Sequence, residues 1–325
     1  MASAFFALDL GGTKCAALLG RLGEAHDVLD KRIFSTASLG APQDALATLG
    51  NALDEMAEQH GVKPEAIGIS CGNPMNAREG IVLSPPNMQG WANVSVVETL
   101  VQRFGVPARL MNDANAGCLA EARFGAAKGY RHAVFLTMGT GMGAGLILNG
   151  SLYEGASGSG GEVGHMRLFP EGPVGYGKRG SFEGFCSGGG IAQMARQRAV
   201  EAMQRGKPLA WCAKPEHLAA LMTKQVAEAA HAGDDTARAV FAEAGTWLGR
   251  GLALILDIIN PEVVAIGGVY PRCRELLEKS MRTVLSAEVL PDVYAACAIV
   301  PAQLGEAIGD VSALCVAETA KRESA

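Results

Sequence analysis

The sequence predicts an α/β protein in which one structural unit occurs twice. Short apolar runs, typical of buried strands, alternate along the chain with longer segments whose apolar residues recur at helical spacing. A strand, a glycine-rich turn and a second strand follow one another near the start of each half. The two turns read Asp9-Leu10-Gly11-Gly12-Thr13-Lys14 and Thr137-Met138-Gly139-Thr140-Gly141-Met142-Gly143. This repetition indicates a duplicated fold that closes on a phosphate chain.

Length and composition narrow the class of protein. The 325 residues suffice for two domains, and 49% apolar with 6% aromatic residues suit a cytoplasmic α/β protein. The net charge is −5 and lysine and arginine form no run, so we expect neither nucleic acid nor a membrane as partner. We expect no signal peptide and no apolar run long enough to cross a bilayer. The eight cysteines lack a Cys-x-x-Cys pair and are expected to be thiols.

The first quarter of the chain is expected to form a hairpin, a third strand and a helix. Strands are expected at residues 4–8 and 15–19, on either side of the first turn, and at residues 31–35. Pro42 opens the helix and Gly61 ends it. Four apolar residues of this helix share one face, namely Leu46, Leu49, Leu53 and Met56. This face is expected to cover the strands.

The next segment leads to a polar strand end. A buried strand at residues 66–70 runs into a turn that contains Gly72, and residues 80–91 are expected to form a loop. A helix follows, with an inner side made of Val97, Leu100, Val101 and Phe104. After Pro107 a strand at residues 108–111 delivers Asn112 and Asp113 to its carboxyl end. Open α/β sheets bind their ligands at such ends.

The second half repeats the hairpin and adds helices. A helix is expected at residues 114–124 and the second hairpin at residues 131–149, and the glycine-rich residues 154–190 are expected to form a long functional loop. The remaining expected elements are helices at residues 190–205, 215–232, 236–259 and 306–321 and a strand at 263–266 that Gly267 and Gly268 close. We expect an N-terminal lobe of residues 1–112 and a larger lobe of residues 113–304, with a terminal helix at about 305–322 that packs back on the first lobe.

The two glycine turns are the first candidate binding site. Glycine permits positive φ and close approach, so successive backbone N–H groups can point at anionic oxygens. Gly11, Gly12, Gly139, Gly141 and Gly143 are therefore expected to bind the phosphates of a nucleotide. Thr13 and Thr140 offer hydroxyl groups to phosphate and Lys14 offers a cation, while a purely structural role as tight turns is the alternative. Asp9 is expected to face hydrated Mg²⁺ on the triphosphate, or else to cap the turn.

Asp113 is the candidate catalytic residue. A hydroxyl group is a poor nucleophile, and a positioned carboxylate can accept its proton while a phosphoryl group moves. The alternative is an aspartate that caps the helix beginning at Ala114, and both roles are compatible.

Together these motifs resemble the ROK family. The resemblance rests on the Asp9–Lys14 turn, Asn112-Asp113, the second glycine turn and Gly161-Glu162-Val163-Gly164-His165, in the order and approximate spacing of that family. The family comprises bacterial sugar kinases and sugar-responsive repressors. It implies a duplicated actin-like, hexokinase-like (ribonuclease H-like) ATPase fold, with two lobes around a cleft that holds the sugar, and a homodimer.

The resemblance also implies roles for further residues. Asn112 would bond a sugar hydroxyl, Gly72 and Asn87 would line the sugar site, and Glu162 and His165 would contact ring hydroxyls. Glu183 would complete the sugar site, or else be a solvated loop carboxylate. Gly267 and Gly268 resemble the turn on the adenosine side, although strand-ending glycines are common. His165 has a loop-stabilising role as its alternative.

The zinc site of the resembling kinases is not expected here. Their cysteine cluster corresponds to residues 174–183, where Val174, Tyr176 and Ser181 stand at the ligand positions. A structural zinc site needs four nitrogen or sulfur ligands, and one nearby thiol, Cys186, cannot replace three. Without zinc the His165 ring must be held by packing or by another hydrogen bond, and Tyr176 and Glu183 are both candidates.

The expected function is therefore that of an ATP-dependent hexokinase. We expect MgATP to phosphorylate the primary hydroxyl of a glucose-like hexose. The alternatives are a kinase for N-acetylmannosamine, fructose, allose or mannose, and a non-catalytic sensor of sugar or ATP. A repressor is disfavoured, because only eight residues precede Asp9 and leave no room for a helix-turn-helix module.

Overall fold

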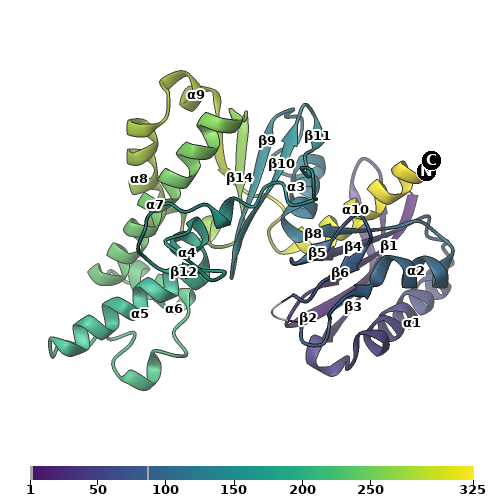
Figure 1. Ribbon diagram of the computed structural model, residues 1–325, viewed down its shortest axis with the longest axis horizontal. Coiled ribbons are helices and arrows are strands. Elements are labelled where there is room, and N and C mark those ends of the chain that lie inside the picture. Colours follow the sequence, from purple (N-terminus) through teal and green to yellow (C-terminus); the bar gives the residue numbers. More distant parts are fainter. Residues whose placement is uncertain (1–2, 86–87) are drawn as a thin grey trace. The chain divides into compact units, whose positions relative to one another are not determined.

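The structure is a computed structural model that describes residues 3–85 and 88–325 (Figure 1). It divides into two compact units. The first consists of Met1–Gly129, Leu152–Gly160 and Gln303–Ala325, and the second of Tyr130–Ser151 and Gly161–Ala302. Helix α3 (Asp113–Phe124) packs on α10 (Ile308–Ser324) within the first unit. The division therefore falls later in the chain than the expected boundary after residue 112.

The first unit is built on a five-stranded sheet of order β3-β2-β1-β4-β8. Its strands are β1 (Ser3–Leu10), β2 (Lys14–Leu22), β3 (His26–Ser35), β4 (Ile67–Cys71) and β8 (Ala108–Asn112). β1 pairs antiparallel with β2 and parallel with β4, which pairs parallel with β8. Consequently Leu10, Cys71 and Asn112 lie side by side at the carboxyl ends of three neighbouring strands.

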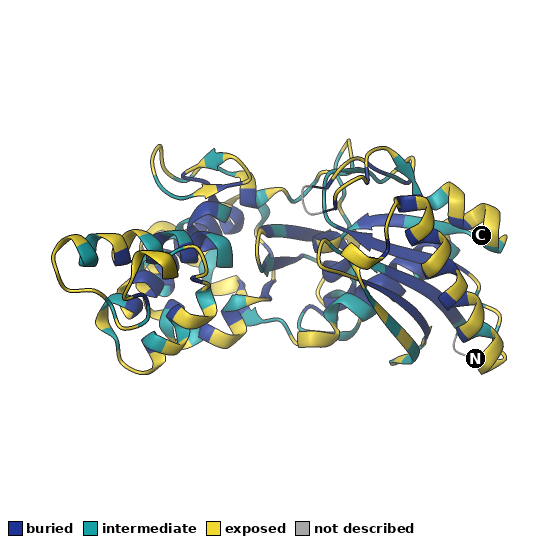
Figure 2. Cartoon of the chain, turned by 90° about the horizontal axis from the view of Figure 1, so that it is seen from below, coloured by how far each residue is buried: buried dark blue, intermediate teal, exposed yellow. Residues whose placement is uncertain are grey.

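Helices cover both faces of this sheet. Alternate residues of a strand point to opposite faces, so Phe6 and Leu8 of β1 pack with the residues of α1 (Pro42–His60), while Phe5 and Ala7 pack with those of α10. Figure 2 shows the strands buried beneath partly exposed helices. The remaining elements of this unit are α2 (Val96–Phe104), the 3-10 turns η1 (Thr36–Ser38) and η4 (Gly305–Ala307), and the short strands β5 (Met75–Asn76), β6 (Ile81–Val82) and β7 (Val94–Ser95).

The second unit repeats the strand arrangement of the first. Its sheet has the order β11-β10-β9-β14-β15. These strands are β9 (Ala133–Met138), β10 (Met142–Leu148), β11 (Ser151–Leu152), β14 (Val263–Ile266) and β15 (Ala298–Pro301). β9 and β10 form an antiparallel hairpin, and β14 and β15 join it in parallel, as β4 and β8 join β1. The expected duplicated α/β fold is confirmed.

Within the described residues, the second unit also contains six helices. They are α4 (Phe182–Cys186), α5 (Gly188–Gln204), α6 (Thr223–His231), α7 (Asp235–Ile259), α8 (Val269–Glu288) and α9 (Pro291–Ala296). α7 is long and apolar enough, by length and composition, to cross a membrane, contrary to the expectation of no such run. It packs against α8, α6 and α4, and residues such as Leu248 and Leu252 are fully buried. Its apolar residues are those of a core helix.

The structure corrects several expected elements. The helix expected at residues 215–232 begins only at Thr223, because Pro215–His217 is a separate 3-10 turn, η3. The segment 154–190 contains the 3-10 turn η2 (Val163–His165), the hairpin of β12 (Val174–Gly175) and β13 (Lys178–Arg179), and α4. Val101, expected on the inner side of α2, is 38% exposed, whereas Leu100 is buried as expected and Val96 is buried with it.

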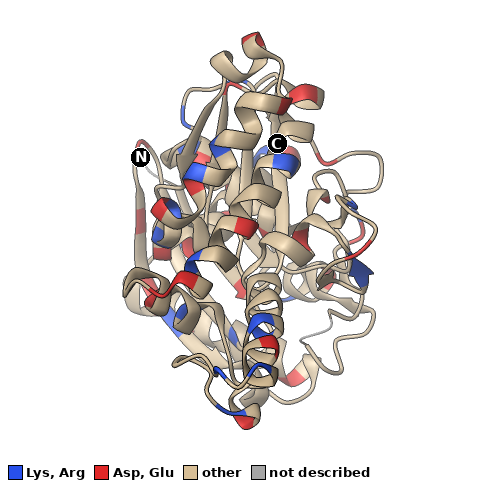
Figure 3. Cartoon of the chain, turned by 90° about the vertical axis from the view of Figure 1, so that its left-hand side faces the viewer, with Lys and Arg blue, Asp and Glu red and all other residues tan. Residues whose placement is uncertain are grey.

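Charged residues of both signs are interspersed on the surface, as Figure 3 shows. Several form exposed ion pairs, among them Arg103 with Asp54 and Arg198 with Glu243, at 2.7 and 2.9 Å. Exposed pairs of this kind contribute at most about 1 kcal/mol each. The stability of each unit therefore depends mainly on its apolar core.

The cysteines give a first testable prediction. All eight are buried, and none is in a disulfide. Burial, and secondarily the nearby Asp113 and Asp9 carboxylates, raise the pKa of Cys71 to about 12, and burial raises the pKa of Cys315 to about 12 as well. Since the thiolate is the reactive form, a raised pKa keeps these thiols protonated at pH 8. We expect Ellman's reagent to label native protein slowly at pH 8 and all eight thiols rapidly after denaturation; fast native labelling would contradict the burial.

Candidate active site

The carboxyl ends of β1, β4 and β8 gather the predicted residues of the first unit. Asp9 lies next to the last residue of β1, Gly72 follows β4, and Asn112 ends β8. The three strands are parallel neighbours, so their polar ends lie at one edge of the sheet. Gly72 is half-buried there. Asn87, the other expected lining residue, lies outside the described residues.

The first glycine turn is tight and tied to a neighbour. The Gly11 amide donates to the Lys14 carbonyl at 3.1 Å. Thr36, which lies outside the turn, donates two hydrogen bonds to it. Its hydroxyl donates to the Gly11 carbonyl at 2.6 Å and its amide to the Thr13 carbonyl at 3.0 Å. Gly12, Thr13 and Lys14 are exposed. Three carbonyls of the turn therefore have donors. Its exposed groups are available to an anion. Thr36 was not predicted, because no local pattern links it to the turn.

Asp9 faces a small cavity with charged walls. The cavity has a volume of about 220 Å³, and Lys14, Lys31 and Asp310 are among its lining residues. Burial raises the pKa of the Asp9 carboxyl, Asp310 raises it further, and Lys14 and Lys31 act in the opposite direction. The Lys31 Nζ binds both oxygens of Asp310 at 2.7 Å. Lys31 and Asp310 are 279 residues apart, so no local pattern could predict this pair.

Asn112 and Asp113 both cap α3. The Ala114 amide donates to Asn112 Oδ1 at 3.0 Å and to Asp113 Oδ1 at 2.8 Å. Asn112 is the N-cap residue, as its extended backbone requires. Asp113 is exposed. Capping engages one carboxylate oxygen, so the helix-capping role and a role in proton transfer are compatible.

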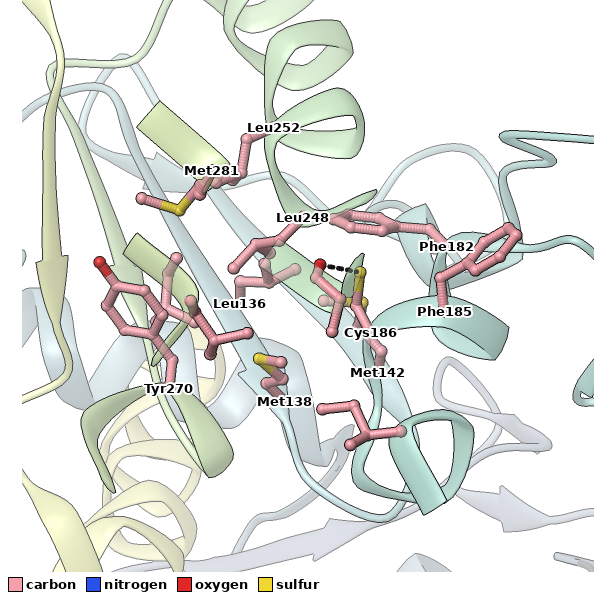
Figure 4. Packing of buried hydrophobic residues seen from close by; sticks show 14 of the residues in the cluster. Leu136, Met138, Met142, Phe182, Phe185, Cys186, Leu248, Leu252, Tyr270 and Met281 are labelled. Carbon is pink, nitrogen blue, oxygen red and sulfur yellow. Dashed lines mark hydrogen bonds between the residues drawn. The ribbon is translucent and has the colours of Figure 1, made fainter. Parts of the chain in front are cut away.

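The second glycine turn is held by two helices of its own unit. The amides of Gly188 and Gly189, at the start of α5, donate to the carbonyls of Gly139 and Thr140 at 2.7 and 3.3 Å. Beneath the turn, Met142 and Cys186 belong to the buried cluster drawn in Figure 4, in which the Cys186 thiol donates to the Ala244 carbonyl. Gly139 and Gly143 are half-buried, whereas Thr140 and Gly141 are exposed.

Glu183 lies at this turn as well. It projects from α4, and its Oε2 accepts a hydrogen bond from the Met142 amide at 3.0 Å. A Cβ atom at Gly141 would lie 2.9 Å from the same oxygen, so a larger residue there would require the Glu183 side chain to shift. The structure thus connects the Glu183 side chain to the glycine turn through a hydrogen bond from a backbone amide, which the sequence did not predict.

Glu162 and His165 lie on a segment that packs on β10, directly after the turn. The Ala144 amide donates to the Gly161 carbonyl at 3.0 Å. A Cβ atom at Gly164 would lie only 2.1 Å from the Met142 carbonyl, so only glycine allows the segment to approach so closely. Glu162 and His165 are both exposed. The structure therefore brings them and Glu183 around one turn.

Gly268 lies against the same turn, and Gly267 precedes it directly after β14. The Gly267 amide donates to the Leu136 carbonyl at 2.9 Å, which continues the pairing of β14 with β9. Gly268 has a φ of 73°, and a Cβ atom there would meet the carbonyl of Met138, a residue of the turn. The predicted residues of the second unit thus form one group.

The three positions that correspond to zinc-ligating cysteines have other contacts. Val174 pairs with Arg179 in the hairpin, and the Tyr176 ring lies beside His165. Ser181 is buried and caps α4 by accepting a hydrogen bond from the Gly184 amide at 3.1 Å. In the part of the chain that is described, no three His, Cys, Asp or Glu side chains are grouped so as to hold a metal ion.

Comparison with known proteins identifies the family. The model of the ROK family matches residues 5–320. The chain belongs to the ROK family. A glucokinase of Thermotoga maritima is 31% identical over 307 residues, which cover 94% of each chain. The ROK family fold is equally evident in solved structures.

Two of these structures are similar over nearly their whole length. A ROK hexokinase from Thermus thermophilus has a TM-score of 0.80 and 28% identity, covering 98% of this chain and 99% of that one. A ROK family glucokinase from Streptomyces griseus, in complex with glucose and AMPPNP, has a TM-score of 0.77 and 29% identity, covering 98% and 100%. The expected actin-like, hexokinase-like fold is confirmed.

Proposed function

We propose that this ROK protein is a sugar kinase that transfers the γ-phosphate of ATP to the primary (6-) hydroxyl of a glucose-like hexose. The observation that supports it most is the arrangement at one sheet edge. An exposed carboxylate, Asp113, follows β8, while Asp9 lies near the end of β1 and the first glycine turn follows that strand. A base and a phosphate-binding turn on strands of one sheet are what phosphoryl transfer to a hydroxyl requires.

Binding and alignment of the nucleotide would supply most of the catalysis. Little covalent chemistry falls to the protein in phosphoryl transfer, so position and charge dominate. We assign the phosphates to the glycine turns, with Thr13, Thr140 and Lys14 as side-chain donors. Gly268, which lies against the second turn, and its neighbour Gly267 are assigned to the nucleoside side.

Asp9 fits a magnesium ion that arrives with ATP. Mg²⁺ keeps several waters and binds through one or two carboxylates together with substrate phosphates, so a cage of protein ligands is not required. Burial and the nearby Asp310 carboxylate raise the pKa of the Asp9 carboxyl. A cation in this cavity would offset the repulsion between the two carboxylates. When bound, the ion would neutralise developing charge on the phosphates.

For the sugar we assign Asn112, beside Asp113, in the first unit. In the second unit we assign Glu162, His165 and Glu183, which lie around the second glycine turn. These side chains offer donors and acceptors for hydroxyl groups. Glucose is favoured by the glucokinase relatives. N-acetylmannosamine, fructose, allose and mannose are the alternative substrates, and a sensor that binds sugar or ATP without turnover is the alternative function.

The deciding experiment is release of ADP from MgATP across a panel of hexoses and N-acetylhexosamines. We expect turnover on glucose well above the rate without sugar, with glucose 6-phosphate as product. Turnover on another sugar of the panel would change the substrate and keep the kinase. No turnover on any sugar by protein that binds ATP would overturn the kinase and favour the sensor.

A further inference from the structure

The turn between β12 and β13 contains a residue with an unfavourable backbone conformation. Tyr176 and Gly177 connect the paired strands, and their φ angles are 43° and 74°. Two positive φ angles in a two-residue loop are the type I′ pattern, for which Asn-Gly is the preferred sequence. A tyrosine in the left-handed region is unfavourable, because its Cβ atom crowds the backbone. Tyr176 is also 67% exposed, so core packing does not account for it. The residue is therefore better explained by what its ring contacts.

That contact is with His165. The two rings meet edge to face, with centroids 6.2 Å apart and planes at 71°. Aromatic rings prefer this arrangement. On the same hairpin, Lys178 Nζ donates a hydrogen bond to the His165 carbonyl at 2.7 Å. The hairpin thus contacts both the ring and the backbone of His165, whose side chain is otherwise exposed.

The hairpin is itself fixed to the body of the second unit. The Gln193 side chain, on α5, accepts from the Val174 amide at 3.1 Å and donates to the Val174 carbonyl at 2.8 Å. After the hairpin, Ser181 caps α4. The hairpin is thus connected to α5 and α4, which fixes the positions of Tyr176 and Lys178. These two residues can therefore restrict the motion of the His165 side chain.

We propose that Tyr176 and Lys178 are positioning residues that hold the His165 imidazole ready for a sugar hydroxyl. This inference rests on the proposed function, in which His165 binds the sugar. It assigns to this hairpin the support that neighbouring groups commonly give to a functional histidine. An exposed side chain that is already ordered loses less conformational freedom when the sugar binds.

Tyr176→Asn is the most informative variant, because it should lower the affinity for glucose without lowering thermal stability. Asparagine is the preferred residue for this turn, so thermal stability should stay the same or rise. Loss of the ring should free His165, and we expect the Kd of D-glucose, measured by calorimetry without nucleotide, to rise about 3- to 10-fold. The KM for glucose should rise by a similar factor, while kcat and the KM for ATP stay unchanged. A purely structural role would change stability and affinity in the same direction.

Three matched variants complete the test. Tyr176→Phe keeps the ring and should bind glucose as the wild type does. Lys178→Met removes the bond to the His165 carbonyl and should weaken glucose binding. Arg179 lies on the same hairpin, and its ion pair among the described residues is with exposed Glu171 at 3.8 Å. Arg179→Met should therefore leave glucose binding unchanged.

A double-mutant cycle with His165→Ala decides whether Tyr176 acts through the histidine. We expect Tyr176→Asn to change the Kd of glucose no further in that background. Additive losses would mean that Tyr176 touches the sugar itself and would overturn the positioning role. A wild type that phosphorylates glucose while Tyr176→Asn binds it equally well would overturn the inference alone. A wild type that binds no glucose would overturn the proposed glucose kinase, and the inference with it.

Discussion

Replacement of Asp113 by asparagine is expected to lower kcat for glucose phosphorylation by about 10²- to 10⁴-fold, the range of general base catalysis. The amide oxygen of asparagine can still accept the Ala114 amide, which Asp113 Oδ1 binds at 2.8 Å. The start of α3 should therefore be preserved. An amide cannot take up the proton of the sugar hydroxyl, so the chemical step is lost selectively. A coupled assay of ADP release at saturating glucose and MgATP measures the effect.

Asp234→Asn is the matched control for this variant. Asp234 caps α7, and its Oδ1 accepts from the Ala237 amide at 2.8 Å, so the same substitution is made at a carboxylate that binds a backbone amide at the start of another helix. It should leave kcat unchanged. Asp113→Asn should in turn keep the Kd of glucose and the melting temperature within the range of the wild type. A kcat within about threefold of the wild type would show that Asp113 only caps α3 and would remove the base from the mechanism.

The fold was largely predictable because its strongest signals are local. The two glycine turns each join two apolar strands, and their repetition predicted the duplicated sheet that β1/β2 and β9/β10 display. The strand expected at residues 263–266 coincides with β14, and the helix opened by Pro42 ends before Gly61 as expected. Family and fold were confirmed by the comparisons.

Other elements were missed for different reasons. β12 and β13 have two residues each, too few to show a period, so residues 154–190 resembled a loop. No helix was predicted at Val269–Glu288, although buried Leu277, Met281 and Leu285 recur at helical spacing, a signal that could have identified α8. The non-helical backbone of Cys273 interrupts that pattern near its start.

The sequence predicted where the candidate site residues lie on the strands, but not most of their contacts. The sequence placed Asp9, Asn112 and Asp113 at strand ends, since local patterns define those ends. It did not reveal that Thr36 holds the first turn or that Asp310 and Lys31 flank Asp9. Such partners are distant in the chain and meet only in three dimensions. The bond from the Met142 amide to Glu183 spans 41 residues and is invisible for the same reason.

Glu121 is another such residue, and its loss is expected to have the largest effect on stability. The side chain is fully buried, and its carboxylate accepts three backbone hydrogen bonds within the first unit. Their donors are the amides of Ala126, Gln303 and Leu304, at 2.7, 3.2 and 2.9 Å. These bonds connect the end of α3 to the segment that leads into α10.

Glu121→Ala should therefore lower the free energy of unfolding of the first unit by about 3–5 kcal/mol, because it leaves three buried amides without an acceptor, at about 1–3 kcal/mol each before relaxation. Urea unfolding followed by the fluorescence of buried Trp91, in a background with Trp211 and Trp247 replaced by phenylalanine, measures this unit. Glu121→Gln keeps one acceptor oxygen and should lose less. Glu318→Ala, an exposed partner of Arg123, should lose under about 1 kcal/mol. Equal losses in Glu121→Ala and Glu318→Ala would show that the buried carboxylate does not hold α3 to the C-terminal segment.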